Sequence, residues 1–221
     1  GDVKYFDYNE DGDISDADRM NVGKAIPDFY GGITSNFSYK GFDLSLFGQF
    51  SVGGKVMSAW RGVNGSEGTD HLGLALSNVK VNDRGESVEQ YFNVSKEVAN
   101  GYWRGEGTSN TIPRPVRIGV HTGYDYDYNV QTSTRYLEDA SYFKLKTVTL
   151  GYTLPESVVK KLRVNSLRVY VSADNLLTLT KYSGYDPETS FSGSPGDSNY
   201  GVDFGLQPVL RTFIFGLNLN F

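Results

Sequence analysis

The stretch Asp7 to Asp18, DYNEDGDISDAD, has the residue types and spacing of a calcium-binding loop. Such a loop takes oxygen ligands from alternate positions and from its last residue, and it needs a glycine at the turn. The positions are filled by Asp7, Asn9, Asp11, Asp13 through its carbonyl, Ser15 through water, and Asp18, with Gly12 at the turn. We therefore expect a structural Ca²⁺ ion here. A solvated Asp/Asn/Gly turn is the alternative.

Aromatic side chains form the second candidate site. Trp60, Trp103 and Tyr126 lie in polar, loop-like sequence and could face a ligand, together with Tyr102, Tyr124 and Tyr128. Sugar rings stack on aromatic faces, which is the chemistry these residues could supply. Tyrosine-rich loops also pack against one another or against partner proteins, and this interpretation is the one we favour.

Other chemistries find little support in the composition. The chain has no cysteine and two histidines, His71 and His121, neither near a nucleophile motif. No glycine-rich phosphate loop follows a strand and opens a helix. The net charge of -5 and the pI of about 5.1 argue against nucleic acid as a partner. We expect a protein that is not an enzyme and holds no catalytic residues.

The elements that position these residues are strands, because apolar and polar residues alternate with a period of two. Five segments show this pattern: 29–39, 42–52, 143–154, 166–176 and 211–221. Lys40-Gly41 predicts a tight turn, and Pro155 predicts one helical turn after the third strand. The stretch 53–136 shows no sustained strand. Helical spacing of Val88, Tyr91 and Val98 predicts a short helix within it.

The strands suit a transmembrane barrel better than a soluble sandwich. Connections alternate between long and short, and aromatics lie near the strand ends, as in outer-membrane barrels. The sequence ends on Phe221 after alternating apolar residues, which is typical of such barrels. It begins at Gly1 without a signal peptide, which suggests a fragment. The alternative is a soluble calcium-dependent β-sandwich that binds carbohydrate, and detergent dependence would separate the two classes.

Several long motifs carry a family resemblance. YLEDASYFKLKTVTLGYTLP (136–155), LRVYVSADNLLTLTKYSGYDPE (167–188) and RTFIFGLNLNF (211–221) resemble the C-terminal end of SusC/RagA-type TonB-dependent transporters of Bacteroidetes. PDFYGGITSNFSYKGFDLSLFGQFSVGG resembles the segment just upstream. The resemblance implies an antiparallel transmembrane β-barrel of about 22 strands with a plugged lumen, of which this chain would hold a partial, open sheet without the plug.

The same resemblance implies a function and partners. It implies import of oligosaccharides or peptides across the outer membrane, with a SusD-like surface lipoprotein and the TonB complex as partners. Residues 1–28 would form an extracellular loop with the calcium motif, and residues 29–221 the C-terminal barrel strands. Segments 53–136 and 181–208 would also be extracellular, and the turns at 40–41 and 155–165 periplasmic. The expected lipid face is Phe42, Leu44, Leu46, Val148, Leu150, Val169, Val171, Phe213, Phe215 and Leu217.

Overall fold

The computed structural model describes residues 1–61, 75–81, 84–91, 93, 95–119, 129, 132–188 and 200–221. The chain divides into two compact units. One comprises Gly1–Gly23, Met57–Leu137 and Val202–Gly205, and the other comprises Lys24–Val56, Glu138–Gly201 and Leu206–Phe221. The second unit holds the long strands. No helix within the described residues is both long and apolar enough to cross a membrane.

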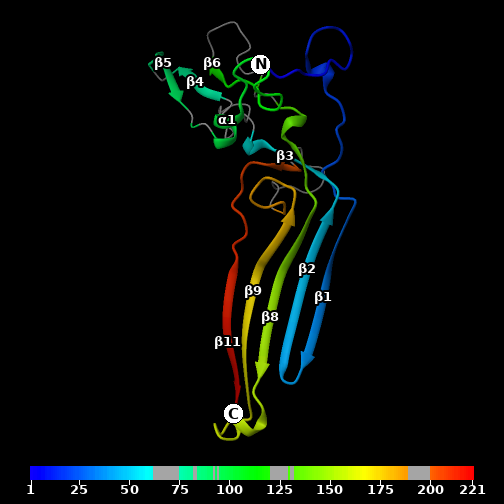
Figure 1. Ribbon diagram of the computed structural model, residues 1–221, viewed down its shortest axis with the longest axis vertical. Helices are drawn as coiled ribbons and strands as arrows, with labels where there is room; N and C mark the ends of the chain where they lie inside the picture. The colour runs from blue at the N-terminus through cyan, green and yellow to red at the C-terminus, as the bar shows by residue number, and fades with distance from the viewer. Residues whose placement is uncertain are drawn as a thin grey trace. The chain divides into compact units, whose positions relative to one another are not determined.

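The long strands form one antiparallel sheet in the order β1-β2-β8-β9-β11 (Figure 1). Their bounds are Phe29–Tyr39 (β1), Phe42–Val52 (β2), Tyr142–Thr153 (β8), Ser166–Thr180 (β9) and Thr212–Asn220 (β11). Within the described residues β1 and β11 each pair with one neighbour, so the sheet is open. The five predicted strands and the all-β, partial-sheet fold are confirmed.

The short connections lie at one end of this sheet. Lys40 and Gly41 have φ of 47° and 88°, which is the backbone of the tight hairpin turn that keeps β1 and β2 in register. Pro155 precedes α2 (Glu156–Val159), as the sequence predicts. The backbone N–H of Asn165 donates to the carbonyl of Asn220 and joins the second connection to β11 at 2.7 Å. We call this end of the sheet the turn end and the opposite end the loop end.

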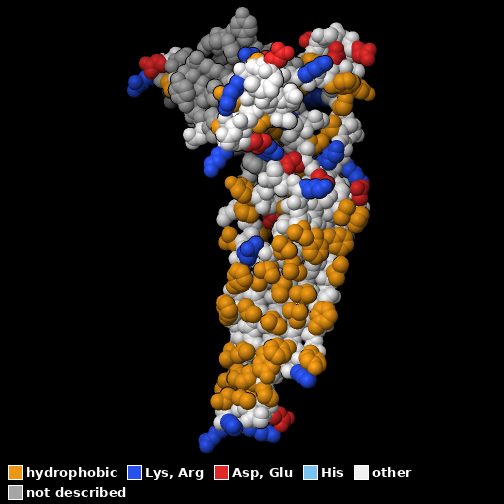
Figure 2. All heavy atoms as spheres, in the orientation of Figure 1, with side chains coloured by type: hydrophobic (Ala, Val, Ile, Leu, Met, Phe, Trp, Pro, Cys, Tyr) orange, Lys and Arg blue, Asp and Glu red, His pale blue; other side chains and the backbone are white. Residues whose placement is uncertain are grey.

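The register gives the sheet one apolar and one polar face. Paired residues point to the same side, and rows such as Leu44, Leu150, Val171 and Phe215 run across four strands. All the residues of the predicted lipid face lie on this apolar face, which is confirmed as one continuous surface. Figure 2 shows hydrophobic side chains spread over the sheet, with lysine and arginine side chains at the turn end and again toward the loop end.

The strands β2, β8 and β9 use different numbers of residues to cover the same part of the sheet. This is seen between two rows of paired residues, Leu46–Val148–Ala173 and Gly48–Leu145–Leu177. Between these rows β2 advances two residues, β8 three and β9 four. The odd step in β8 is a β-bulge at Lys146 and changes which alternate residues face the apolar side. Lys144 and Lys146 therefore share the polar face with Gln49, although Val148 has the same parity and is on the apolar face.

The sheet has almost no buried apolar core of its own. Ala173 is the one described residue of its strands among the buried hydrophobic side chains, whereas Phe215 is 81% exposed and Phe37 60%. A water-soluble sandwich covers such a face with a second sheet. Large exposed apolar surfaces mark sites of contact with another apolar surface or phase. This face is therefore expected to contact an apolar environment rather than water.

The other described elements are short. A three-stranded sheet has the order β5-β4-β6, from Ser87–Tyr91 (β5), Ala75–Val81 (β4) and Val116–Gly119 (β6). Another has the order β10-β3-β7, from Val202–Asp203, Lys55–Ser58 and Leu137–Asp139. The helix α1 (Lys96–Gly101) and 3₁₀ turns at Asp16–Asp18 (η1), Ala59–Arg61 (η2) and Thr134–Tyr136 (η4) complete the described elements.

For this stretch one prediction was wrong and another is confirmed in part. The segment 53–136 does contain strands, which are short and polar enough to escape a search for alternation. The helix is confined to residues 96–101, where Ser95 caps it by accepting the N–H of Val98 at 3.2 Å. Val88 and Tyr91 belong to β5 instead, because antiparallel pairing with β4 outweighs their helical spacing.

Candidate functional site

The acidic loop folds around its own side chains. Asp7 Oδ2 accepts the backbone N–H of Gly12 at 2.8 Å, and Asp11 Oδ1 accepts that of Asp13 at 2.9 Å. Asn9 Oδ1 accepts the N–H of Asp11 at 3.2 Å. Gly12 has a φ of +85°, so it supplies the left-handed turn that the motif requires.

The last residue of the motif closes this loop. Asp18 accepts the backbone N–H of Ser15 at 2.7 Å and that of Tyr8 at 2.8 Å. The hydrogen bond from Ser15, supported by the one from Tyr8, holds the pKa of the Asp18 carboxyl below its usual value. Asp18 therefore stays ionised at neutral pH, as a metal ligand must.

These contacts bring the predicted ligands into one loop but not into one metal shell. Within the described residues, no group of three or more His, Cys, Asp or Glu side chains is placed to hold a metal ion. Most of the carboxylate oxygens accept N–H groups instead. Asp7 Oδ1 is buried without a hydrogen-bond partner. The donor set suits a hard cation, and calcium at Asp7, Asn9, Asp11, Asp13 and Asp18 stays a prediction.

The aromatic candidates have different surroundings. The indole of Trp103 is half-buried and lies directly against Gly1, and its backbone N–H donates to the carbonyl of Ile112 at 3.0 Å. This contact fits packing between loop segments. Trp60 belongs to η2, and its side chain lies outside the described residues, as does Tyr126. A ligand-facing role for these three residues stays a prediction.

Two charged groups occupy the polar face of the five-stranded sheet. Near the turn end, Arg168 on β9 reaches over Gly151 on β8 to Asp43 on β2, with Nε–Oδ1 and Nη2–Oδ2 distances of 2.9 and 2.5 Å. A side chain at Gly151 would collide with both partners, so the glycine makes room for the bridge. The Arg168 guanidinium also lies 4.9 Å from the ring centre of Tyr170.

Near the loop end, Lys144 and Lys146 on β8 meet two carboxylates from the segment after β9. Lys144 Nζ bonds Asp186 Oδ1, and lies 2.8 Å from Glu188 Oε2. Lys146 Nζ lies 2.6 Å from the same Glu188 oxygen. We call these four residues the anchor.

The four residues of the anchor could not be recognised from the sequence as one group. Two signals were present: two lysines inside an otherwise apolar strand, and the adjacent polar pair Lys146-Thr147 that breaks the alternation. The pairing itself could not be read from the sequence, because Asp186 and Glu188 lie 42 and 44 residues after Lys144.

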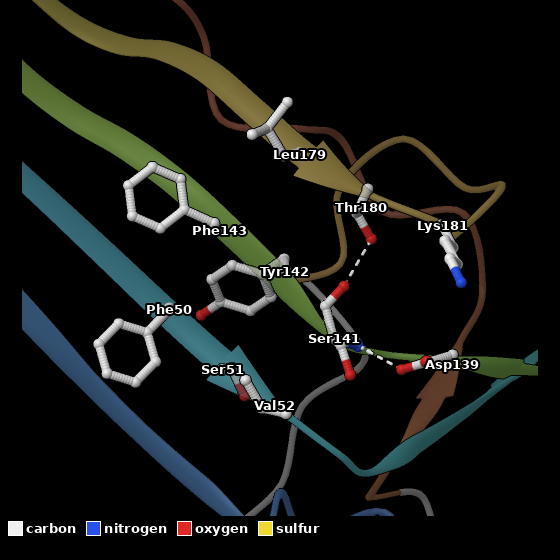
Figure 3. A pocket seen from close by; sticks show the side chains of 10 residues that line it. All are labelled: Phe50, Ser51, Val52, Asp139, Ser141, Tyr142, Phe143, Leu179, Thr180 and Lys181. Atoms are coloured by element: carbon white, nitrogen blue, oxygen red, sulfur yellow. Dashed lines mark hydrogen bonds between the residues drawn. The ribbon is translucent and has the colours of Figure 1, made fainter.

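A hollow opens at the loop end of β2, β8 and β9 (Figure 3). Its volume is about 560 Å³, and its lining combines Phe50, Ser51, Val52, Asp139, Ser141, Tyr142, Phe143, Leu179, Thr180 and Lys181. Hydrogen bonds from Ser141 hold the pKa of the Asp139 carboxyl below its usual value. Thr180 donates its hydroxyl to the carbonyl of Ser141 at 2.8 Å, so these two polar groups of the lining are bonded to each other.

The chain is similar over its length to curated receptors. It is 34% identical to TonB-dependent receptor P3 of Formosa agariphila over 221 residues, which cover 98% of this chain and 19% of that protein. It is 32% identical to receptor P26 of the same organism, covering 100% and 20%. It is 26% identical to the TonB-dependent receptor SusC of Bacteroides thetaiotaomicron, covering 98% and 17%. The chain thus spans about a fifth of the length of these relatives.

Solved structures agree with the fold. A structure of the RagAB peptide transporter matches with a TM-score of 0.61 at 24% identity, covering 90% of this chain and 18% of that chain. The RagAB peptide importer in its open-open state matches with a TM-score of 0.56 at 22% identity, with coverage of 90% and 18%. No protein-family model matches the sequence. The named relatives are receptors and transporters rather than enzymes.

Proposed function

We propose, on the premise that this chain belongs to the SusC-like TonB-dependent receptors of the outer membrane, that its long strands form part of the wall of a nutrient importer. The apolar face would contact lipid and the polar face would line the lumen. The turn end would lie in the periplasm, and the loop end outside the cell.

The continuous apolar face is the observation that carries this proposal. Its rows cross four strands without a charged residue, and its largest side chains are exposed to the surroundings. Lipid is the solvent for which such a face is stable, because it removes the side chains from water. The soluble sandwich, our alternative from sequence, would need these same residues buried against a second sheet.

The cargo and the partners follow from the family alone. The RagAB neighbours are named a peptide importer and transporter, which makes peptides one class of cargo, and oligosaccharides are the other class expected from the sequence. We infer energy coupling through the TonB complex and a SusD-like surface lipoprotein at the loop end. The aromatics of the loop-like sequence are the candidates for contact with a ligand, with Trp60, Trp103 and Tyr126 first among them.

A matched pair of variants tests the wall assignment. Phe215 and Ile214 are neighbours on β11, both exposed, and face opposite sides of the sheet. In the full-length receptor, Phe215→Arg should cost about 2–4 kcal/mol of folding free energy if it lies near the bilayer midplane, whereas Ile214→Arg should cost much less. Outer-membrane level and cargo uptake should fall for the first variant only. Equal losses for both variants would contradict the wall assignment.

We also propose that the acidic loop binds calcium as a structural ion. The buried, unpartnered Asp7 Oδ1 supports this, because a cation is the partner such an oxygen lacks. Chelation should increase protease cleavage near Asp13 in the full-length receptor, and Asp11→Ala should have the same effect without chelator. If neither treatment changes the cleavage rate, the loop is a polar turn without a metal.

A further inference from the structure

We propose that Asp186 and Glu188 lock the start of the segment after β9 onto the polar face of the sheet, so that the chain up to Glu188 is held in a fixed position. This inference rests on the proposed function, because it takes the polar face for the lumen wall. It assigns the anchor to positioning and leaves cargo binding to other residues.

Burial distinguishes this group from ordinary surface ion pairs. The side chain of Lys144 is 2% exposed and that of Asp186 is 7% exposed. Glu188 and Lys146 are more open, at 27% and 21%. A buried charge is stable only with its partner in place, because water can no longer solvate it. The segment could therefore leave the sheet only by exposing Lys144 and Asp186 together.

The charges balance within the anchor. Two ammonium groups meet two carboxylates, and Glu188 bridges both lysines with its two oxygens. The ring of Tyr142 lies 5.6 Å from the Lys144 ammonium and adds a cation–π contact. Because the ions satisfy one another, the group offers no uncompensated charge to a cargo molecule. A positioning role explains the arrangement better than a binding role.

Further hydrogen bonds hold the same segment along its length. Asp186 Oδ1 accepts the backbone N–H of Glu188 at 2.9 Å, which fixes the turn that presents both carboxylates. Closer to β9, both the N–H and the hydroxyl of Ser183 donate to Glu138 at 2.8 Å. Tyr182 is buried, with 6% exposure. The segment 181–188 is thus tied at both ends rather than at one point.

The β-bulge makes this arrangement possible. Without the odd step in β8, Lys144 and Lys146 would continue the parity of Val148 and point to the apolar face. Lysines on the lipid face of a barrel are destabilising. The stagger turns them inward, to where the two carboxylates arrive. One irregularity of the sheet therefore both protects the wall and creates the anchor.

Cysteine accessibility tests the lock directly. The chain contains no cysteine, and Pro187, between the two carboxylates, is buried, whereas Tyr185 is 73% exposed. In the full-length receptor without other accessible cysteines, Pro187→Cys should react with a maleimide at least about tenfold more slowly than Tyr185→Cys, because reaction requires local opening. Adding Lys144→Met should remove most of that protection. Exchanging the charges, with Lys144→Glu and Asp186→Lys together, should restore it in part.

Hydrogen exchange of residues 181–188 gives a second readout that needs no cysteine. Lys144→Met should raise exchange in this segment, while Lys160→Met, an exposed lysine at the turn end, should leave it unchanged. Fast labelling of Pro187→Cys in the parent receptor, or slow labelling and unchanged exchange in Lys144→Met, would overturn the proposal. Neither readout measures transport, so failure of the lock would be distinct from failure of the wall assignment.

Discussion

The two charged groups on the polar face use the same chemistry at opposite ends of the sheet. At the turn end, the bridge from Arg168 to Asp43 joins strand to strand, with side chains 26% and 37% exposed. At the loop end, Lys144 joins a strand to a loop segment and is 2% exposed. The first bridge spans a register that backbone pairing already fixes. The second fixes a segment that has no ladder to hold it.

The comparison shows that burial decides what an ion pair contributes. A pair on a hydrated surface adds little to stability, since water competes for both partners. A buried pair also adds little compared with an apolar replacement, but breaking it by removing one partner is costly. We therefore expect the bridge at the turn end to tolerate substitution of either partner. The anchor should tolerate only substitutions that replace both partners of an ion pair together.

Lys144→Met should have the largest effect, because it leaves Asp186 buried beside one fewer cation. The expected loss is about 3–5 kcal/mol in the free energy that holds the segment or the fold, measured by denaturant unfolding of the full-length receptor in detergent. The double variant Lys144→Met with Asp186→Leu removes both charges and should recover much of this loss. A double variant as unstable as the single one would mean that the two residues are not energetically coupled.

Acidification should open the anchor only at a pH below the usual pKa of a glutamate. Burial raises the pKa of the Glu188 carboxyl, but the hydrogen bonds from Lys144 and Lys146 outweigh it and leave that pKa below the usual value. Because the pKa of Glu188 is lower in the folded state, its ionised form stabilises the segment at a pH above the unfolded-state pKa of about 4.3. This stabilisation is lost as the pH falls through the folded-state pKa. Lys144, Lys146, Asp186 and Tyr142 are the other titratable groups of the cluster.

Hydrogen exchange of residues 181–188, corrected for its intrinsic pH dependence, measures this opening. Protection should be constant at neutral and mildly acidic pH and should fall only below the ordinary glutamate range. In Glu188→Gln the acid-dependent part should largely disappear. Loss of protection already near pH 6 would instead indicate that some other group controls the segment.

Asp43→Asn should have the smallest effect. The bridge is hydrated, and β2, β8 and β9 remain paired through their backbones with or without it. We expect an unfolding midpoint indistinguishable from that of the parent receptor, and only weak dependence of the difference on salt. An effect of Asp43→Asn as large as that of Lys144→Met would remove the contrast between the two ends of the sheet.

The sequence predicts the sheet well because the membrane imposes a simple rule on it. Alternation located all five long strands, and turn-forming residues located the hairpin at Lys40-Gly41 and the turn after Pro155. Each of these features follows from local residue types. The apolar face could also be assigned residue by residue. Where β8 changes parity, the pattern is interrupted by Lys146-Thr147, and the reason appears only from pairing with β2 and β9.

The candidate sites were less accessible to sequence reasoning. The acidic loop is recognisable because its candidate ligands all lie within one short stretch of sequence, and Gly12 takes the predicted backbone conformation. The anchor is not recognisable, because its members come together only when the segment after β9 folds back on β8. The strands of the first unit were missed for a similar reason: β4 pairs in parallel with β6, which lies far along the chain.

The unequal advance of β2, β8 and β9 has a consequence for how such a wall can change during evolution. Losing Lys146 together with the bulge would leave Leu145 and Phe143 on the apolar face and Lys144 on the polar face, because the shortened strand alternates regularly from Val148 onward. Flattening the bulge while keeping Lys146 would instead rotate every side chain beyond that point, which would bring Phe143 to the polar face and Lys144 to the apolar face. The bulge and its extra residue must therefore be gained or lost together, and homologues should carry either both or neither.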